Sequence, residues 1–266
     1  MAKSTAQSVL QVRGGESSRV DDLVVTEAPM EIRLGTTPIA VLMRTPGDDD
    51  DLVRGFALTE AIVLRPDEMA GVRRIGEDTA DARYELTLAP GVTINPEQFR
   101  RNLYTTSSCG VCGKASIDAV RIAAPTPPPG PVIDEDVLLS LPGRMREAQE
   151  TFSATGGIHA AAAFSPDGSM LALREDVGRH NAVDKVVGAL SRDGWPPGEV
   201  LLLVSGRVSF EMVQKAAVAG IPVVGGVSAA SSLAVELAQE LGMTVVGFLR
   251  DDGYNVYSGE ARISRR

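Results

Sequence analysis

The chain has 266 residues, of which 44% are hydrophobic and 4% aromatic, and a net charge of −9. This length fits two closely packed domains or one α/β body with an added layer, and the acidic balance argues against a broad nucleic-acid or anionic-membrane surface. No apolar run approaches the roughly 20 residues of a membrane span, and the start of the chain lacks the apolar segment of a signal peptide. We therefore expect a cytoplasmic protein.

The first half of the chain has the short apolar alternations that are typical of strands. Residues 1–19 are rich in Ser, Gly and Gln without periodicity, and we expect a disordered tail there. Residues 20–124 are expected to form a smaller β-rich domain, with a hairpin loop at 35–38. The expected strands of this domain cover residues 23–25, 30–34, 39–43, 72–75 and 84–88.

Four acidic residues at 48–51 directly precede a helical pattern over residues 52–62. Adjacent acids without spacing are poor metal ligands, whereas acids at a helix start are favoured by the helix dipole. We therefore prefer a solvated first helical turn to a metal site, and we predict no metal-binding residues in the chain.

A run with five prolines predicts an extended connector over residues 125–133. We expect an α/β domain over residues 134–266, with a first helical stretch that Pro142 and Gly143 interrupt. A hairpin and then a strand–helix–strand–helix–strand order follow, which predicts parallel strands covered on both faces. The ends of these strands should meet along their carboxyl edge, where ligands bind in such sheets. The expected strands are 155–164, 170–173, 200–206, 222–225 and 244–248, and the expected helices are 134–139, 145–152, 182–190, 210–219 and 233–241.

The two cysteines of the chain, Cys109 and Cys112, lie together in a loop of small residues, hydroxyls and glycines. We expect a strand at 99–104 before them and a helix at 114–122 after them. In a reducing compartment such a pair is more often metal-binding or catalytic than a structural disulfide. A zinc site with two cysteines and two histidines would use every Cys and His of the chain, and a thioredoxin-type motif lacks its βαβ surroundings here.

A sulfur-carrying thiol is the interpretation that this loop favours most. Such a thiol must be accessible, partly ionised, and on a backbone that can reach a donor and then an acceptor. Glycines beside both cysteines supply that freedom, and the nearby Lys114, Arg100 and Arg101 favour a thiolate. A persulfide is a reversible modification of a thiolate. Zinc binding, redox chemistry and two structural thiols remain alternatives.

Two polar motifs in the second half are candidates for a ligand site. Gly156, Gly157 and His159 fit an anion-binding turn at a strand start, and a packed strand with a satisfied core histidine fits them equally well. Further along, seven residues that include Arg179 and His180 crowd hydrogen-bonding side chains at a helix start. Their density, between two apolar segments, favours a site over simple capping.

A glycine loop follows each of two expected strands. Ser205, Gly206 and Arg207 suit phosphate binding through backbone amides, with Arg207 as the charge partner. Residues 225–232 form a second loop of the same kind. Two such loops on one sheet edge make a nucleotide-like ligand more credible than either alone. The chain has neither a P-loop nor a GxGxxG motif, so a generic ATPase or nicotinamide enzyme is not supported.

Four motifs taken together resemble the FdhD family of formate dehydrogenase accessory sulfurtransferases. They are SSCGVCG at 107–113, TGGIHA at 155–160, EDVGRHNAVDK at 175–185 and SGR at 205–207. The resemblance runs in order from about Val20 to the C-terminus. It implies a second half with a cytidine deaminase-like, three-layer α/β fold without zinc, and it implies a homodimer.

The resemblance also implies a function. Members are sulfur carriers between a cysteine desulfurase and the molybdenum cofactor, bis(molybdopterin guanine dinucleotide), before that cofactor enters formate dehydrogenase. Cys109 would carry the persulfide and Cys112 would assist. A non-catalytic cofactor chaperone and a zinc-binding module are the alternatives. The guanine-dinucleotide-binding segment, for which GDP would be a mimic, would fall on Phe248, Leu249, Arg250, Asp251, Asp252 and Gly253.

Overall fold

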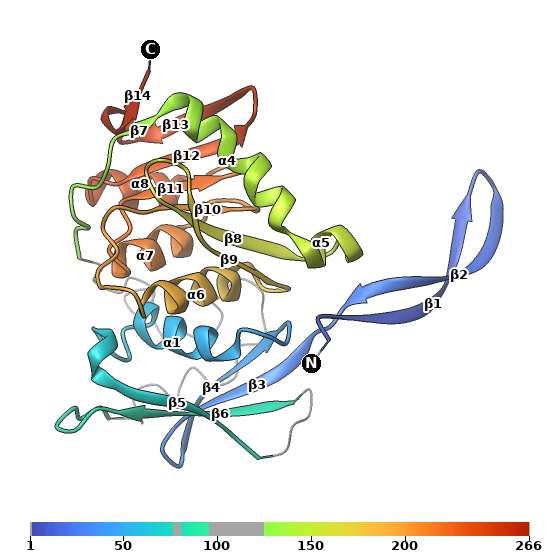
Figure 1. Cartoon of the computed structure of the whole chain (residues 1–266), viewed down its shortest axis with the longest axis horizontal. Coiled ribbons are helices and arrows are strands. Elements are labelled where there is room, and N and C mark those ends of the chain that lie inside the picture. Colours follow the sequence, from blue (N-terminus) through green and yellow to red (C-terminus); the bar gives the residue numbers. More distant parts are fainter. Residues whose placement is uncertain (1, 77–80, 96–124, 266) are drawn as a thin grey trace.

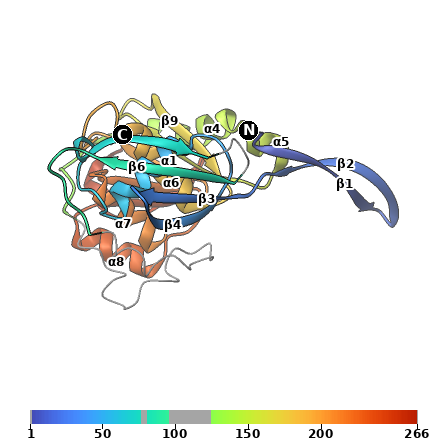
Figure 2. The same ribbon diagram turned by 90° about the horizontal axis from the view of Figure 1, so that it is seen from below.

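The computed structural model describes residues 2–76, 81–95 and 125–265. In this part of the chain, helices separate two sheets, and a long hairpin projects from one side (Figure 1 and Figure 2). The expected fold class, α/β with α+β character, is confirmed. The strand expected at 99–104 and the helix expected at 114–122 lie outside the described residues. None of the described helices is both long and apolar enough to cross a membrane.

A four-stranded sheet forms one end of the molecule, with β3 (Ala28–Leu34), β4 (Thr37–Arg44), β5 (Met69–Ile75) and β6 (Ala82–Leu88). The strand order is β4-β3-β6-β5, and the short helix η1 (Pro66–Glu68) precedes β5. Along β3 every second residue is buried, including Met30 and Ile32, so one face of the sheet packs on the helix layer. Gly35 has a φ of 58° in the turn between β3 and β4, which confirms the expected hairpin.

A six-stranded sheet forms the centre of the second half, with β8 (His159–Phe164), β9 (Met170–Asp176), β10 (Leu201–Val204), β11 (Val223–Gly226), β12 (Thr244–Arg250) and β13 (Gly253–Ser258). The order is β13-β12-β11-β10-β8-β9. β10, β11 and β12 are parallel, and β8 and β9 form an antiparallel hairpin, as predicted. The sequence pattern did not predict β13, which returns antiparallel to β12. Similarity to the cytidine deaminase fold stays a prediction.

Helices cover both faces of the six-stranded sheet (Figure 1). One face carries α6 (Arg179–Leu190), α7 (Phe210–Val218) and α8 (Ser232–Glu240), and the other carries α4 (Glu135–Ala148), which leads into α5 (Glu150–Thr155). The expected break at Pro142 is wrong, because α4 continues through it. Leu138, Leu141 and Met145 bury one face of α4 almost completely. Burial of these side chains on both sides of the proline outweighs the helical hydrogen bond that Pro142 cannot donate.

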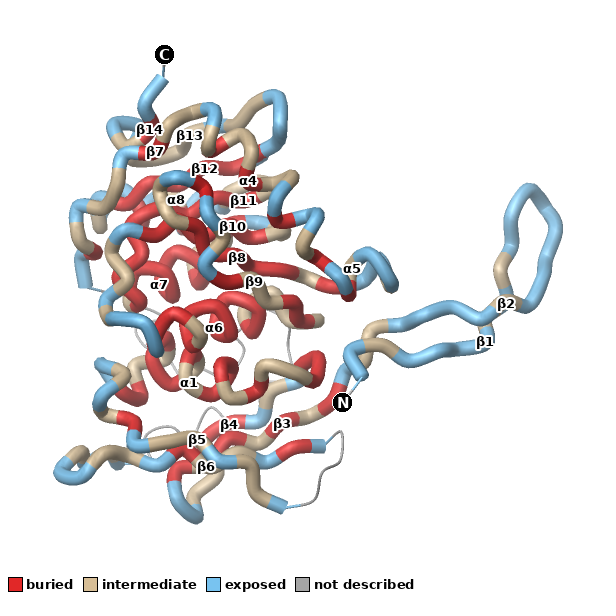
Figure 3. Tube along the Cα trace, in the orientation of Figure 1, coloured by how far each residue is buried: buried red, intermediate tan, exposed pale blue. Residues whose placement is uncertain are grey.

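The two halves of the chain share one hydrophobic core (Figure 3). It joins the inner face of the four-stranded sheet and α1 (Asp49–Thr59) to α6, α7 and one face of the six-stranded sheet. The connector at 125–133 runs without a helix or strand until β7 (Ile133–Asp134), which pairs with β14 (Ile263–Ser264) near the short helix η2 (Glu260–Arg262). A domain boundary at the connector stays a prediction, but the halves are packed too closely to have separate cores.

Two of the four acidic residues at 48–51 are buried, so the expectation of a solvated first turn is wrong for Asp49 and Asp51. Asp49 and Asp51 are only 9% and 6% exposed. Arg44 of β4 donates to Asp49 at 2.9 Å, and Arg174 of β9 donates to Asp51 at 2.7 Å. The Asp51–Arg174 pair therefore crosses the junction between the two halves, and the Asp49–Arg44 pair lies within the first half. The sequence showed only an acidic run.

The N-terminal residues form a hairpin, so the expectation of a disordered tail over residues 1–19 is wrong. β1 (Ser4–Arg13) and β2 (Glu16–Val25) pair antiparallel along their whole length, and the hairpin extends away from the body (Figure 2). Gly14 and Gly15 both have positive φ in the turn, which is the geometry a two-residue hairpin needs. The Gly-Gly pair was the available signal. The strands are almost entirely exposed, which is why no buried face shows in the sequence pattern.

Candidate functional site

The loops that follow the parallel strands meet along the carboxyl edge of the six-stranded sheet, as the sequence predicted. The Val227 N–H donates to the Val204 carbonyl at 3.1 Å, and the Phe248 N–H donates to the Ser228 carbonyl at 3.0 Å. Close packing requires small residues here, because a Cβ on Gly226 would lie 2.6 Å from the Val208 side chain. The loops are therefore held together by backbone contacts.

A cavity of about 1080 Å³ opens at this edge, between the loops and the α4–α5 segment. This volume is slightly above the usual range of roughly 300–1,000 Å³ for small-molecule and cofactor sites. Eight of the fourteen residues that the sequence nominated for cofactor binding line it. These are Gly156, Gly157, His159, Ser205, Leu249, Arg250, Asp251 and Asp252.

The other nominated residues do not line the cavity. Arg207 is exposed, and the Nε2 atom of His180 faces the carboxylate of Glu211 of α7. Gly206 lies behind His159, since a Cβ there would be 3.6 Å from the imidazole Nδ1. Arg179, Phe248 and Gly253 also fall outside the cavity wall.

Phe248 has an unusual backbone for its position. Its φ is 51°, which a bulky residue adopts only at a cost, and its side chain remains 41% exposed. The register of β12 against β13 shifts between Gly247 and Arg250. This irregularity directs the next residues, Leu249 to Asp252, along the cavity.

His159 contributes a neutral imidazole to the cavity edge. Burial lowers its pKa below the ordinary value of 6.5, and the positive charge of Arg179 lowers it further. Asp176, its partner on β9, opposes this effect. At neutral pH the ring therefore presents one hydrogen-bond donor and one acceptor without a charge.

The dense polar block at 175–185 serves packing more than the cavity. Lys185 has no exposed surface and donates to Asp176 at 2.8 Å and to the Thr45 carbonyl at 2.9 Å. Asp184 likewise accepts from Lys215 of α7 at 2.8 Å. These contacts join the residue after β4, the strand β9 and the helices α6 and α7, so the block connects the two halves of the chain.

One member of that block does shape the cavity. The carboxylate of Glu175 accepts from the N–H groups of Thr151 and Phe152, both at 2.8 Å. It thereby caps the start of α5 in place of a side chain from the helix itself. This places Phe152 on the cavity wall.

Sequence reasoning missed the α4–α5 wall of the cavity. Met145, Arg146, Gln149 and Phe152 all line it. Met145 and Arg146 are in the last turn of α4, Phe152 is in α5, and Gln149 joins the two helices, with a spacing of three or four residues from Met145 or Arg146 to Gln149 and from Gln149 to Phe152. That spacing was visible in the sequence, but it is also the pattern of an ordinary buried helix face.

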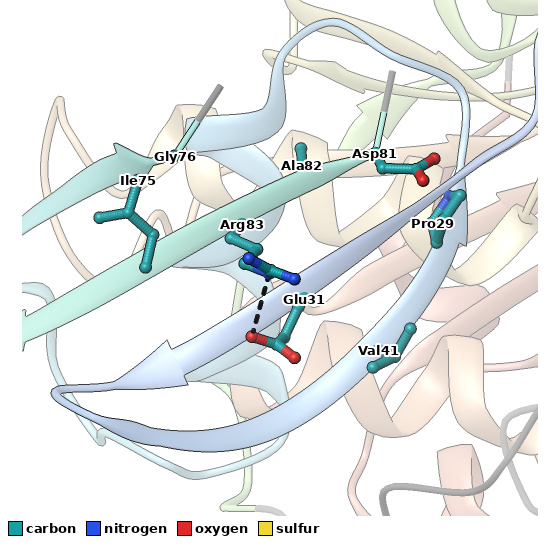
Figure 4. A pocket seen from close by; sticks show the side chains of 8 residues that line it. All are labelled: Pro29, Glu31, Val41, Ile75, Gly76, Asp81, Ala82 and Arg83. Carbon is teal, nitrogen blue, oxygen red and sulfur yellow. Dashed lines mark ion pairs between the residues drawn. The ribbon is translucent and has the colours of Figure 1, made fainter. Parts of the chain in front are cut away.

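A second hollow, of about 530 Å³, lies on the outer face of the four-stranded sheet (Figure 4). Glu31 pairs with Arg33 at 2.7 Å and faces Arg83 at 3.8 Å. Its charges therefore already have partners in the protein. No residue nominated from the sequence lines this hollow, so we place the candidate site at the carboxyl edge of the six-stranded sheet. Cys109 and Cys112 lie outside the described residues.

The fold and the cavity define a mixed α/β protein with a large cavity where the loops after the parallel strands meet. A family model, the FdhD/NarQ family, matches residues 25–264. The chain belongs to this family, which confirms the resemblance.

Relatives and a solved structure agree with this assignment. The chain is 49% identical to the sulfur carrier protein FdhD of Streptomyces avermitilis, over 98% of this chain and 95% of the relative. It is 50% identical to the protein of that name from Mycobacterium tuberculosis, over 91% and 92%. The crystal structure of a proposed formate dehydrogenase accessory protein from Desulfotalea psychrophila has the same fold, with a TM-score of 0.79 at 22% identity, over 99% of this chain and 100% of that one.

Proposed function

We propose that this protein carries sulfur for the maturation of a formate dehydrogenase. Cys109 takes persulfide sulfur from a cysteine desulfurase and passes it to the molybdenum cofactor, bis(molybdopterin guanine dinucleotide), before the cofactor enters the enzyme. Family membership carries this proposal, because relatives at 49% and 50% identity are named sulfur carrier proteins. We place the activity in the cytoplasm, where thiols stay reduced, and in a homodimer.

The first step is a thiol exchange. The Cys109 thiolate attacks the outer sulfur of the desulfurase persulfide, the sulfur–sulfur bond of the donor breaks, and the donor cysteine leaves as a thiolate. Cys109 then holds the persulfide. The exchange is balanced without an external oxidant or reductant, and it needs only an accessible thiolate.

The cofactor is the acceptor, and the cavity at the carboxyl edge is where we propose that its nucleotide portion binds. Arg250 is suited to contact phosphate, and Asp251 and Asp252 can accept hydrogen bonds from the N–H groups of a base. Gly156 and Gly157 have no side chains, so they leave the backbone accessible at the cavity edge. The space beside Gly156 is open, because a Cβ added there would have no neighbour within 4 Å. Arg179, His180, Gly206 and Arg207 were also expected to bind the cofactor, but they do not line the cavity. They would influence binding only by positioning the residues that do line it.

Mass spectrometry of the intact protein tests this proposal. After incubation with a cysteine desulfurase and cysteine, the protein should gain the mass of one sulfur atom, and peptide mapping should place it on Cys109. Cys112→Ala should retain the added sulfur, whereas Cys109→Ala should not. If Cys109→Ala still supports an active formate dehydrogenase, the proposal fails and a non-catalytic cofactor chaperone replaces it.

A further inference from the structure

The hairpin formed by β1 and β2, which we call the arm, is exposed along almost its whole length and carries apolar side chains on one face (Figure 3). Leu10 and Val12 of β1 are 61% and 64% exposed, and Leu23 of β2 is 41% exposed. The antiparallel register places all three on the same face, because residues directly opposite each other share a face. On the other face, Val9 and Val20 lie opposite each other and are both partly buried. The face with Leu10 is therefore the one that needs a cover.

This face of the arm cannot pack on the body of its own chain. The base of the arm is fixed there, since the Thr26 N–H donates to the Lys3 carbonyl at 2.9 Å and the Lys3 ammonium lies 3.4 Å from the Asp48 carboxylate. From this base the ten-residue strands run outward for roughly 33 Å (Figure 1 and Figure 2). An isolated two-stranded hairpin is marginally stable in water. A second molecule is therefore the cover that the arm requires.

The outer face of the four-stranded sheet is another apolar surface without a cover. Val41 and Met43 of β4 are 44% and 42% exposed. Val41 also lines the hollow of about 530 Å³, together with Pro29 and Ile75 (Figure 4). In the described part of the chain, the helices lie against the inner face of this sheet and not against the outer one (Figure 1). This face therefore offers both apolar side chains and a depression that can receive others.

We propose that the arm binds a second copy of this chain and lies across the outer face of that copy's four-stranded sheet. Each copy brings one arm and one such face, so a two-fold exchange covers both arms in a closed dimer. The arm has two strands of ten residues, which matches the roughly 20–30 residues that each side gives to an interface of ordinary size. The inference rests on the homodimer of the proposed function and names the surfaces that join its copies.

The charges beside the two apolar surfaces are complementary. Asp21 of β2 shares the face of the arm that carries Leu10. On the sheet, the side chains of Arg83 and Arg73 are 66% and 73% exposed, although each faces a glutamate of its own chain. A carboxylate of the arm can therefore approach a guanidinium group that borders the hollow. Opposite charges at the rim of an interface guide the encounter of the two copies and fix how they align.

The oligomeric state of the full chain tests the inference. Size-exclusion chromatography with light scattering at micromolar concentration should give twice the mass of one chain. The double variant Leu10→Asp/Val12→Asp should raise the dissociation constant at least about a hundredfold. Its folding is safeguarded, because neither residue belongs to a hydrophobic core. Leu171→Asp is the matched control, since Leu171 of β9 is also an exposed strand leucine, at 51%, and should leave the dimer intact.

Two results of this experiment would overturn the inference. A wild-type chain that stays monomeric would leave the arm to a different protein. A Leu10→Asp/Val12→Asp protein that dimerises as the wild type does would place the contact between copies on another surface.

A crosslinking experiment identifies the surface that receives the arm. We would place the photoreactive residue p-benzoylphenylalanine at position 12 of the full chain and mix isotopically labelled with unlabelled protein. Crosslinked peptides should join the arm of one copy to β3, β4 or β6 of the other. In addition, Val41→Asp/Met43→Asp should weaken dimerisation as much as the arm variant does. Crosslinks within one chain, or to a different surface of the second copy, would refute the proposed docking face.

The outcome can be separated from that of sulfur transfer. If Leu10→Asp/Val12→Asp remains dimeric while wild-type Cys109 acquires sulfur, the role of the arm is wrong and sulfur transfer stands. If the arm variant is monomeric but no sulfur appears on Cys109 of the wild type, the role of the arm stands and sulfur transfer is wrong.

Discussion

Gly55 of α1 lies directly against the backbone carbonyl of Asp184 of α6. A Cβ atom at Gly55 would lie 1.7 Å from that oxygen, and a Cβ at Gly188 would lie 1.9 Å from the Asp51 carbonyl oxygen. Two glycines thus let the two helices cross with their backbones in contact. Since α1 belongs to the first half and α6 to the second, this contact fixes how the halves pack.

We predict that Gly55→Ala destabilises the protein by about 3 kcal/mol or more, because the contact with the backbone of α6 leaves no room for a methyl group. Gly143→Ala is the matched control, since Gly143 is also in a helix and a Cβ there would meet nothing within 4 Å. It should be stabilising by roughly 0.5–1 kcal/mol. Urea unfolding of the three proteins measures both effects. A Gly55→Ala protein as stable as the wild type would show that the helices can separate at no cost.

The buried pair of Lys185 and Asp176 gives a second prediction. Lys185→Met leaves the Asp176 carboxylate buried without its cation, so we expect a loss of about 3–5 kcal/mol in the free energy of unfolding. A second change, Asp176→Asn, should restore part of that loss. Arg65→Met is the control, because the Arg65–Asp67 pair is about two-thirds exposed and should be worth at most about 1 kcal/mol. If Lys185→Met and Arg65→Met have the same effect on urea unfolding, the buried pair has no special role.

Periodicity predicted most of the elements of the second half. Continuous apolar runs marked the buried strands β10 and β11, and helical spacing marked the helices between the strands. Both signals lie within the segment itself, so they can be read from the sequence. Two features needed information from outside each segment. Pro142 remains within a helix because α4 packs on a sheet made by residues far away in sequence. Asp49 and Asp51 can be buried because Arg44 and Arg174, from two other strands, pair with them.

The candidate site was predicted only in part, for a similar reason. Glycine loops after strands are visible in the sequence, so the carboxyl edge could be located. The opposite wall could not, because Gln149 and Phe152 resemble any helix residues until the position of α4 over the sheet is known. Conversely, the dense polar motif around Arg179 and His180 looked like a site, since such a motif does not reveal whether its charges face a ligand or one another.

The exposed hairpin gives a third prediction. Deleting residues 2–25 should change the melting temperature of the remaining body by no more than a few degrees, because no residue of β1 or β2 belongs to either hydrophobic core. Isolated two-stranded hairpins are marginally stable in water, so the arm itself contributes little. Thermal unfolding followed by circular dichroism tests this. A fall of ten degrees or more, about that of a core mutation, would show that the arm packs on the body more than its exposure indicates.

The lowered pKa of His159 gives a pH-dependent prediction. In the folded protein its pKa lies below the ordinary 6.5, so below about that pH the unfolded chain binds a proton that the folded chain resists. His159 therefore destabilises the protein as the pH falls through 6.5 toward its folded pKa, and has no such effect well above 6.5.

Relative to the wild type, a His159→Asn protein should become more stable on acidification from about pH 7.5 to about pH 5. Urea unfolding of both proteins at the two pH values measures this difference, and the other titrating groups largely cancel in it. A difference that does not change with pH would mean that His159 titrates as it does in the unfolded chain, and that burial and Arg179 do not keep it neutral beside the cavity.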